Sequence, residues 1–216
     1  MREEFLKFIE YLIRSLDGRA GRWVRYVYYR KRLGGCGKHV IIEPGVFFQN
    51  PAFIFLGNNI WIDRYAVLVA GPFSPGRRKF LAKPNPHYTG KVGELVISDG
   101  VHLAPFTLLQ AHAGLSIGRC VTIASGAKVY SLSHHYQNLT DPLDHKRYSF
   151  SSMAPPEEQF LIASPVVIGD HAAVGLNAVV LPGTSLLEGS WLGVLSHISE
   201  ATERETIYVS EKARKK

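Results

Sequence analysis

The sequence is poor in cysteine and has no long apolar run. Its 216 residues include two cysteines, Cys36 and Cys120, which lack metal-ligand spacing and are too few for a disulfide framework, so a reducing, cytoplasmic compartment is expected. No stretch reaches the roughly 18 consecutive apolar residues that a membrane-spanning helix needs. The first residues mix both charges, unlike the basic and then apolar pattern of a secretion signal. We therefore expect a protein that does not cross a membrane.

Acidic residues are missing from a stretch near the start of the chain. Residues 19–32, RAGRWVRYVYYRKR, carry six basic side chains and no acid, and the tail EKARKK at 211–216 is also basic. The net charge of the whole chain is +7, so the part between these segments is slightly acidic. A nucleic-acid-binding protein spreads basic residues over a broad surface. We therefore expect no nucleic-acid partner.

The N-terminal segment shows helical spacing, with Gly18 between two runs. The apolar residues are Phe5, Phe8, Ile9, Leu12, Ile13 and Leu16 in the first run, and Ala20, Trp23, Val24, Val27 and Tyr28 in the second. Two interpretations are open. The helices either pack against the rest of the protein or another subunit, or residues 1–33 rest on an anionic membrane, where each basic side chain contributes about 1 kcal/mol.

An aliphatic residue recurs every six positions along the rest of the chain. Shorter runs begin at Leu56, Ile97 and Ile117, and the longest comprises Ile168, Val174, Val180, Leu186, Leu192 and Ile198. A six-residue unit of a short strand and a turn can stack only by coiling, so that each aliphatic side chain is covered by the next coil. We expect the residues of the longest run to be buried. Glycine follows the aliphatic residue in several units, where the backbone turns sharply.

The stretch IASPVVIGDHAAVGLNAVVLPGTSLLEGSWLGVLSHIS, at 162–199, resembles the C-terminal coils of the hexapeptide-repeat acyltransferases. This superfamily includes maltose, galactoside and capsular-sugar O-acetyltransferases, and the resemblance covers residues 37–209. It implies an all-β fold, a left-handed parallel β-helix, between a helical segment at 1–36 and a basic tail at 210–216. It also implies a cyclic homotrimer that transfers an acetyl group from acetyl-CoA to a sugar or glycan precursor.

Two adjacent histidines lie in VYSLSHHYQ, at 129–137, a stretch similar to the catalytic element of the family. The resemblance gives His134 the role of general base at a coil corner that faces the cleft between subunits, while His135 stands where Asp is frequent. A hydroxyl is a poor nucleophile, and a neutral imidazole can take its proton as it attacks the thioester of acetyl-CoA. Such direct transfer needs no acyl-enzyme.

The same resemblance places the CoA arm between neighbouring C-terminal coils. The residues implied for cofactor binding are Leu176, Val194, Ser196, Ser199, Lys212 and Arg214. The sequence departs from the family pattern here, because Leu176 replaces a small residue and Ser199-Glu200 replaces Thr-Lys. Basic residues of the tail are the expected substitute for that lysine at the CoA phosphates.

Two long segments interrupt the repeat, at 72–94 and 136–163. Loops of this length in a compact domain are usually functional or disordered, and the second follows the histidines directly. We expect it to wall the acceptor pocket. The candidate substrate-binding residues are Arg77, Arg78, His135, Arg147, Glu157 and Glu158.

Other functions stay open at this point. The acceptor group can be the amine of an amino sugar or nucleotide sugar instead of a hydroxyl. A carbonic anhydrase of the same coiled architecture needs three zinc histidines, including an H-x4-H pair, which His112, His134 and His135 do not supply, and we expect no metal site. A non-catalytic trimeric scaffold accounts for the repeats but gives the histidine loop and the basic ends no role.

Overall fold

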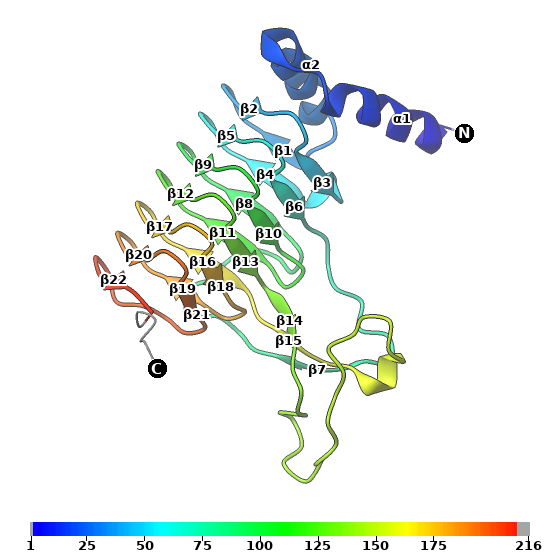
Figure 1. Ribbon diagram of the computed structural model, residues 1–216, viewed down its shortest axis with the longest axis vertical. Coiled ribbons are helices and arrows are strands. Elements are labelled where there is room, and N and C mark those ends of the chain that lie inside the picture. Colours follow the sequence, from blue (N-terminus) through cyan, green and yellow to red (C-terminus); the bar gives the residue numbers. More distant parts are fainter. Residues whose placement is uncertain (1, 211–216) are drawn as a thin grey trace, which may run out of the picture.

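The chain forms two helices and a long coil of short strands (Figure 1). The computed structural model describes residues 2–210. The helices are α1 (Arg2–Arg14) and α2 (Gly18–Arg30). Each complete turn of the coil then contributes one strand to each of three parallel sheets.

The three sheets run along the coil, and each strand pairs with the strands of the adjacent turns. The first sheet contains β1 (Gly35–Cys36), β4 (Ile54–Leu56), β8 (Leu95–Ile97), β11 (Leu115–Ile117), β16 (Val166–Ile168) and β19 (Ser185–Leu186). The second contains β2 (Ile41–Ile42), β5 (Trp61–Ile62), β9 (His102–Leu103), β12 (Thr122–Ile123), β17 (Ala173–Val174), β20 (Trp191–Leu192) and β22 (Ile207–Tyr208). The third contains β3 (Phe47–Gln49), β6 (Val67–Val69), β10 (Leu108–Gln110), β13 (Lys128–Tyr130), β18 (Val179–Val180) and β21 (His197–Ile198).

The interior of the coil is a stack of aliphatic side chains. Leu109, for example, pairs with Leu68 of the previous turn and with Val129 of the next, and all three are buried. The residues of the longest repeat are at most 7% exposed. The prediction of their burial is therefore confirmed, as is the all-β fold, a left-handed parallel β-helix of hexapeptide repeats.

The corners of the coil combine a left-handed backbone conformation with close approach of neighbouring turns. Asn59, Cys120 and His171 lie at equivalent corners of different turns, with φ values of 55°, 55° and 58°. Turns also approach one another closely: a Cβ on Gly175 would lie 2.7 Å from backbone atoms of the Gly193 turn. A side chain at that position would force the turns apart, so the coil requires glycine there.

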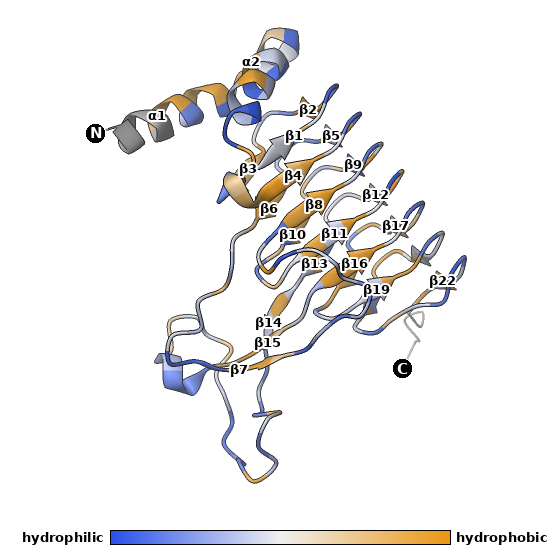
Figure 2. Cartoon of the chain, turned by 180° about the vertical axis from the view of Figure 1, so that it is seen from behind, coloured by the Kyte–Doolittle hydropathy of each residue, from blue (hydrophilic) through white to orange (hydrophobic). Residues whose placement is uncertain are grey.

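The two insertions leave the coil at the same edge, between a strand of the third sheet and the next strand of the first sheet (Figures 1 and 2). The first insertion carries β7 (Lys79–Ala82) and the second ends with β15 (Phe160–Ala163), while β14 (Leu132–His134) leads from the coil into the second. β15 pairs antiparallel with β14 and parallel with β7, so these strands form a separate small sheet. Segments predicted as two loops thus build one projecting unit, which we call the insertion sheet.

The N-terminal helices join the coil through α2, whose buried residues are Gly21, Arg25 and Tyr29. The Arg25 guanidinium donates to the carbonyl oxygens of Ile42, at 2.7 Å, of Ile13, at 3.0 Å, and of Leu16. One cation therefore joins α1, the α1–α2 turn and the first turn of the coil.

The buried face of α2 differs from the apolar run identified in the sequence. Trp23 is 67% exposed, and Val27 is also exposed. The reason is that the carbonyl oxygens beneath α2 need hydrogen-bond donors, which Arg25 supplies and an apolar side chain cannot. Gly21 packs directly against the carbonyl group of Leu16. A Cβ at this position would collide with that group, so the contact requires glycine.

Candidate active site

Three polar side chains form a row across the insertion sheet. Gln159 Oε1 accepts a hydrogen bond from Arg78 Nε at 2.8 Å, and His134 Nε2 lies 3.4 Å from the same oxygen. The strand register places His134 opposite Leu161, and Leu161 opposite Phe80. Side chains alternate between the faces of a strand, so His134 and Phe80 lie on the same face of the sheet. Residues 81 positions apart, Arg78 and Gln159, thus meet beside His134.

Gln159 favours the His134 tautomer that carries its proton on Nε2. Its side chain is 1% exposed, and its Nε2 donates to the carbonyl oxygens of Ala154, at 2.5 Å, and Ser152, at 3.4 Å. The amide therefore cannot be turned around, and its Oε1 is an acceptor toward both Arg78 and His134. The neutral imidazole accordingly holds its proton on Nε2. Its Nδ1 lone pair is then available to accept a proton.

His135 points to the opposite face of the sheet. Its ring stacks on Tyr136, with 4.8 Å between ring centroids, and meets Phe160 edge-on at 6.5 Å. Its Nδ1 lies 3.0 Å from the carbonyl oxygen of Gln137 and 3.2 Å from the amide nitrogen of the same residue. The adjacent histidines therefore belong to different surroundings, a polar row for His134 and an aromatic cluster for His135.

The position of His134 differs from the expected coil corner. The chain leaves the coil at Ser131, whose hydroxyl accepts from the Ala113 amide at 2.9 Å. It then continues as the extended strand β14 because β15 offers it a pairing edge. His134 consequently projects beyond the coil, on the insertion sheet, where residues of both insertions can contact it.

An apolar cavity of about 480 Å³ adjoins the His134 face of the insertion sheet. Phe80, Ala82 and Ala163, all on that face, line it from the sheet, while Phe73 and His112 also contribute to its walls. His112 Nδ1 lies 2.9 Å from the carbonyl oxygen of Gly71. A carbonyl can only accept, so His112 holds its proton on Nδ1 and its Nε2 carries the lone pair.

Asp144 anchors the second insertion to the first. Its Oδ2 accepts from the Tyr148 hydroxyl at 2.6 Å, from Asn138 at 2.8 Å and from Lys79 Nζ at 2.9 Å. These donors, Tyr148 foremost, hold the pKa of the Asp144 carboxyl well below its ordinary value. The Tyr148 hydroxyl and the Asp144 carboxylate in turn raise the pKa of Lys79. Lys79 begins β7 directly after Arg78, and because side chains alternate along a strand, this contact lies on the face of the insertion sheet opposite the polar row.

The remaining candidate substrate-binding residues lie on the same projecting unit. Arg77 is exposed beside Arg78, and Glu157 and Glu158 belong to the exposed 3-10 helix η2 (Pro156–Glu158), which directly precedes Gln159. The Arg147 guanidinium lies 5.5 Å from the centroid of the Tyr136 ring. Both insertions thus supply charged side chains to the unit that carries His134.

Known proteins resemble this chain in sequence and in structure, although no protein-family model matches it. It is 26% identical over 173 residues to the dTDP-4-amino-4,6-dideoxy-D-glucose acyltransferase of Escherichia coli, which spans 80% of this chain and 76% of that protein. It is 30% identical over 117 residues to WbbJ of Escherichia coli K12, described as a lipopolysaccharide biosynthesis O-acetyl transferase, across 53% and 56% of the two chains.

Two solved structures share the fold. AntD, an N-acyltransferase from Bacillus cereus in complex with dTDP and 3-hydroxybutyryl-CoA, superposes with a TM-score of 0.67 and 20% identity over 88% of each chain. The hexapeptide-repeat acetyltransferase VCA0836 from Vibrio cholerae gives 0.53 and 18%, across 99% of this chain and 90% of that one. By these comparisons the chain is an acyltransferase, and it shares the fold of a hexapeptide-repeat acetyltransferase.

The residues of this acyltransferase expected to bind CoA lie along its last turns. Leu176 and Val194 are exposed after β17 and β20, on stacked corners. The Ser196 side chain is buried, and its hydroxyl accepts from the Ser210 amide at 2.8 Å, so it is already used within the chain. Ser199 contributes to a hollow of about 220 Å³ beside the last strand. Lys212 and Arg214 lie outside the described residues.

Possible metal ligands are dispersed over the part of the chain that the structure describes. Within residues 2–210, no three His, Cys, Asp or Glu side chains come together closely enough to hold a metal ion. The three histidines weighed for zinc have separate surroundings instead: His112 contacts Gly71, His134 contacts Gln159, and His135 contacts Gln137.

Gln159, His112 and Asn85 carry no distinguishing signal in the sequence. Gln159 and Asn85 lie in insertions, where the six-residue period does not apply. Asn85 is buried and clamps the first insertion to the later coils, because its amide donates to the carbonyl oxygens of Pro165, at 3.0 Å, and Thr184, at 3.2 Å. The flanking prolines mark a turn but say nothing of these distant partners.

Proposed function

We propose that this acyltransferase transfers the acetyl group of acetyl-CoA to a hydroxyl of a sugar or glycan precursor, with His134 as the general base. The observation that carries the proposal is the polar row. Gln159 holds the His134 proton on Nε2 and leaves Nδ1 to accept one, on a sheet face that adjoins a cavity of about 480 Å³. Two similar proteins act on sugars or on lipopolysaccharide, by their names.

The chemistry is a direct transfer. The acceptor oxygen attacks the thioester carbonyl carbon while its proton passes to His134 Nδ1, and a tetrahedral intermediate forms. The C–S bond then breaks, the ester remains on the sugar, and the protonated imidazole returns its proton to the CoA thiolate. Every proton is accounted for, and no acyl-enzyme is needed.

A second candidate is N-acylation of an amino sugar carried by a nucleotide. It is favoured by the relative that aligns over 80% of this chain, which is named for such a sugar, and by the fold of AntD, which was crystallised with dTDP. A neutral amine is a better nucleophile than a hydroxyl, so this reaction depends less on a base. Arg77 and Arg147, both exposed on the insertions, are suited to a diphosphate.

The proposal includes a homotrimer that works in the cytoplasm. Tyr65, Phe106 and Leu195 are exposed at one coil corner, and the Tyr65 and Phe106 rings stack at 5.5 Å. Such an apolar edge favours contact with another subunit. Both cysteines are free thiols, which suits a reducing compartment. A monomer in light scattering at micromolar concentration would contradict the trimer.

The test is release of free CoA thiol from acetyl-CoA in the presence of sugars, nucleotide sugars and nucleotide-linked amino sugars, with mass spectrometry of the product. The proposal predicts a product that gains one acetyl group and loses it in mild base, because esters hydrolyse and amides do not. A base-stable product made only from amino sugars supports the second candidate. No thiol release with any acceptor contradicts both.

A further inference from the structure

The N-terminal helices leave an apolar stripe uncovered. Tyr11 is 70% exposed and Trp23 is 67% exposed, and Phe8, Leu12 and Leu16 are exposed as well. On α1, Phe8 and Leu12 are one helical step of four residues apart, so they share a face. The helices are held to the coil by Arg25 instead of by these side chains. Large aromatic residues exposed together on one element indicate a surface that meets an apolar phase or a partner.

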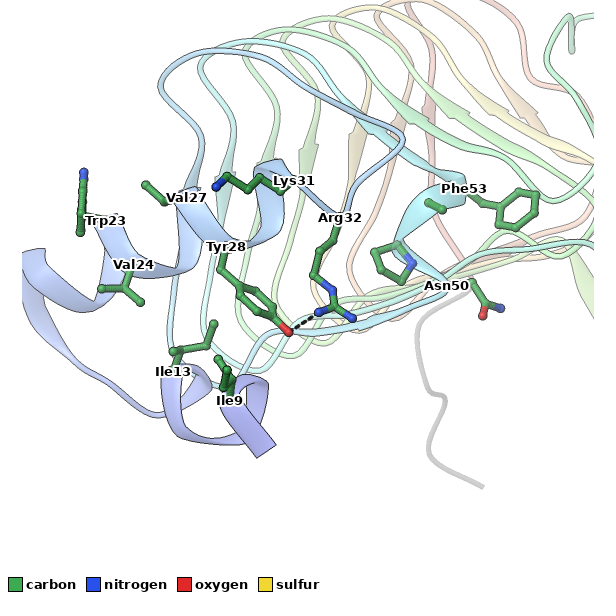
Figure 3. A pocket seen from close by; sticks show the side chains of 12 residues that line it. Ile9, Ile13, Trp23, Val24, Val27, Tyr28, Lys31, Arg32, Asn50 and Phe53 are labelled. Atoms are coloured by element: carbon green, nitrogen blue, oxygen red, sulfur yellow. Dashed lines mark hydrogen bonds between the residues drawn. The ribbon is translucent and has the colours of Figure 1, made fainter. Parts of the chain in front are cut away.

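A groove of about 830 Å³ runs between α1, α2 and η1 (Pro51–Phe53) (Figure 3). Ile9, Val24 and Val27 contribute apolar side chains to it, and Lys31 and Arg32 contribute cations. Arg32 Nη1 donates to the Tyr28 hydroxyl at 2.6 Å. The groove is therefore lined by both apolar and positively charged side chains.

The charge of α2 and of the residues that follow it is one-sided. No acid occurs between Asp17 and Glu43, and these two acids are engaged, Asp17 with Arg64 at 2.9 Å and Glu43 with Arg22. Glu10 is engaged with Arg14, at 3.2 Å. Arg19, Arg30 and Lys31 are exposed, so the surface presents uncompensated positive charge beside exposed aromatic residues.

We propose that this surface docks on an anionic lipid bilayer. Headgroup phosphates would meet Arg19, Arg30 and Lys31, while Tyr11, Leu12 and Trp23 enter the interface. The basic residues favour a bilayer over a second copy of the chain on this surface. Two copies that met through it would bring the same positive side chains together and repel each other. No described helix is both long and apolar enough to cross a bilayer, so the contact is interfacial. This inference is independent of the proposed reaction.

The experiment is sedimentation of the full chain with vesicles of phosphatidylcholine alone or of phosphatidylcholine with one-third phosphatidylglycerol. Binding to the anionic vesicles only, weakened by added salt, is the expected result. Each basic side chain contributes roughly fivefold to partitioning, so the double variant Arg30→Glu, Lys31→Glu is expected to lose at least about 25-fold. Arg30→Glu alone should also bind more weakly, while Arg204→Glu, near the last strand, is its matched charge control and should bind as the wild type does.

The apolar part has its own matched pair. Leu12→Ser and Trp23→Ser are expected to weaken binding, while Leu143→Ser, at a residue 84% exposed on the second insertion, is expected to have no effect. Equal binding to neutral vesicles, or no binding to either kind, would overturn the proposal. So would a change of oligomeric state in Leu12→Ser without a change in vesicle binding, because it would assign the stripe to contact between copies.

Discussion

The contact between Gln159 and His134 predicts how the pH dependence of acyl transfer responds to Gln159→Glu. In this variant a carboxylate replaces the amide oxygen that faces the Nε2 proton of His134, and it stabilises the protonated ring. Only the neutral ring can accept a proton from the acceptor. The acid limb of the kcat profile is therefore expected to move to higher pH, so that turnover falls on the acidic side and recovers on the alkaline side.

The size of the effect follows from the geometry. An opposite charge within about 4–6 Å shifts a titration by about 1–3 units, but Arg78 lies 2.8 Å from the same oxygen and offsets part of the charge. We therefore expect a shift of about one pH unit. In Gln159→Leu the contact is lost entirely. Its 3.4 Å length puts it at the weak end of the range of about 0.5–1.5 kcal/mol, which corresponds to a fall in kcat of roughly two- to fivefold.

The assay is kcat and KM for acetyl-CoA as functions of pH in the wild type and both variants, with circular dichroism to establish that each is folded. A positioning role for Gln159 predicts changes in kcat and in the acid limb with little change in KM. If the acid limb is unchanged in Gln159→Glu and kcat is unchanged in Gln159→Leu, the role assigned to the contact between Gln159 and His134 is refuted. A change confined to KM would instead indicate that Gln159 shapes the binding site.

Two further predictions concern stability. Arg25→Ala leaves the three carbonyl oxygens that Arg25 contacts without their donor. We therefore expect the free energy of unfolding to fall by about 2–4 kcal/mol, with a lower thermal midpoint by calorimetry. Arg19→Ala, at an exposed position, is the control and should have little effect. Because the folded pKa of Asp144 lies below its ordinary value of 3.8, its stabilisation is complete above that pH and is lost as pH falls further. Pepsin should then cut residues 136–150 of the wild type increasingly below about pH 3.8. Asp144→Asn should be cut more readily at about pH 4, with a difference that shrinks as pH falls, and equal cleavage of the two proteins at about pH 4 would contradict this role.

The repeating part of the fold could be predicted because one rule governs every turn. Each aliphatic residue of the six-residue period is buried by the equivalent residue of the next turn, so the residues from Ile168 to Ile198 reveal their surroundings through spacing alone. His134 could be named as a candidate for a related reason, since it follows such a run after Val129 and resembles a family element.

The insertion sheet and the docking of α2 could not be predicted in this way. The partners of Gln159 and Asn85 are set by chain segments that meet far from one another in sequence, and no local pattern encodes such a meeting. In α2, amphipathic spacing left open whether the face that carries Trp23 packs against the protein or meets a membrane, and it did not show that the face that carries Arg25 would be buried against carbonyl oxygens. The spacing of apolar residues predicts which apolar side chains are buried, but it cannot predict the burial of a cation such as Arg25.

The central claim is that His134 is the base of the transfer, and the turnover of His134→Ala with acetyl-CoA tests it most directly. We expect turnover to fall by roughly 10²–10⁴-fold, the usual size of general acid–base assistance, with CoA affinity nearly unchanged. His145→Ala, at an exposed position of the same insertion, is the matched control, and His135→Ala should do far less than His134→Ala. Near-normal turnover in folded His134→Ala, or a comparable loss in His135→Ala alone, would contradict the account.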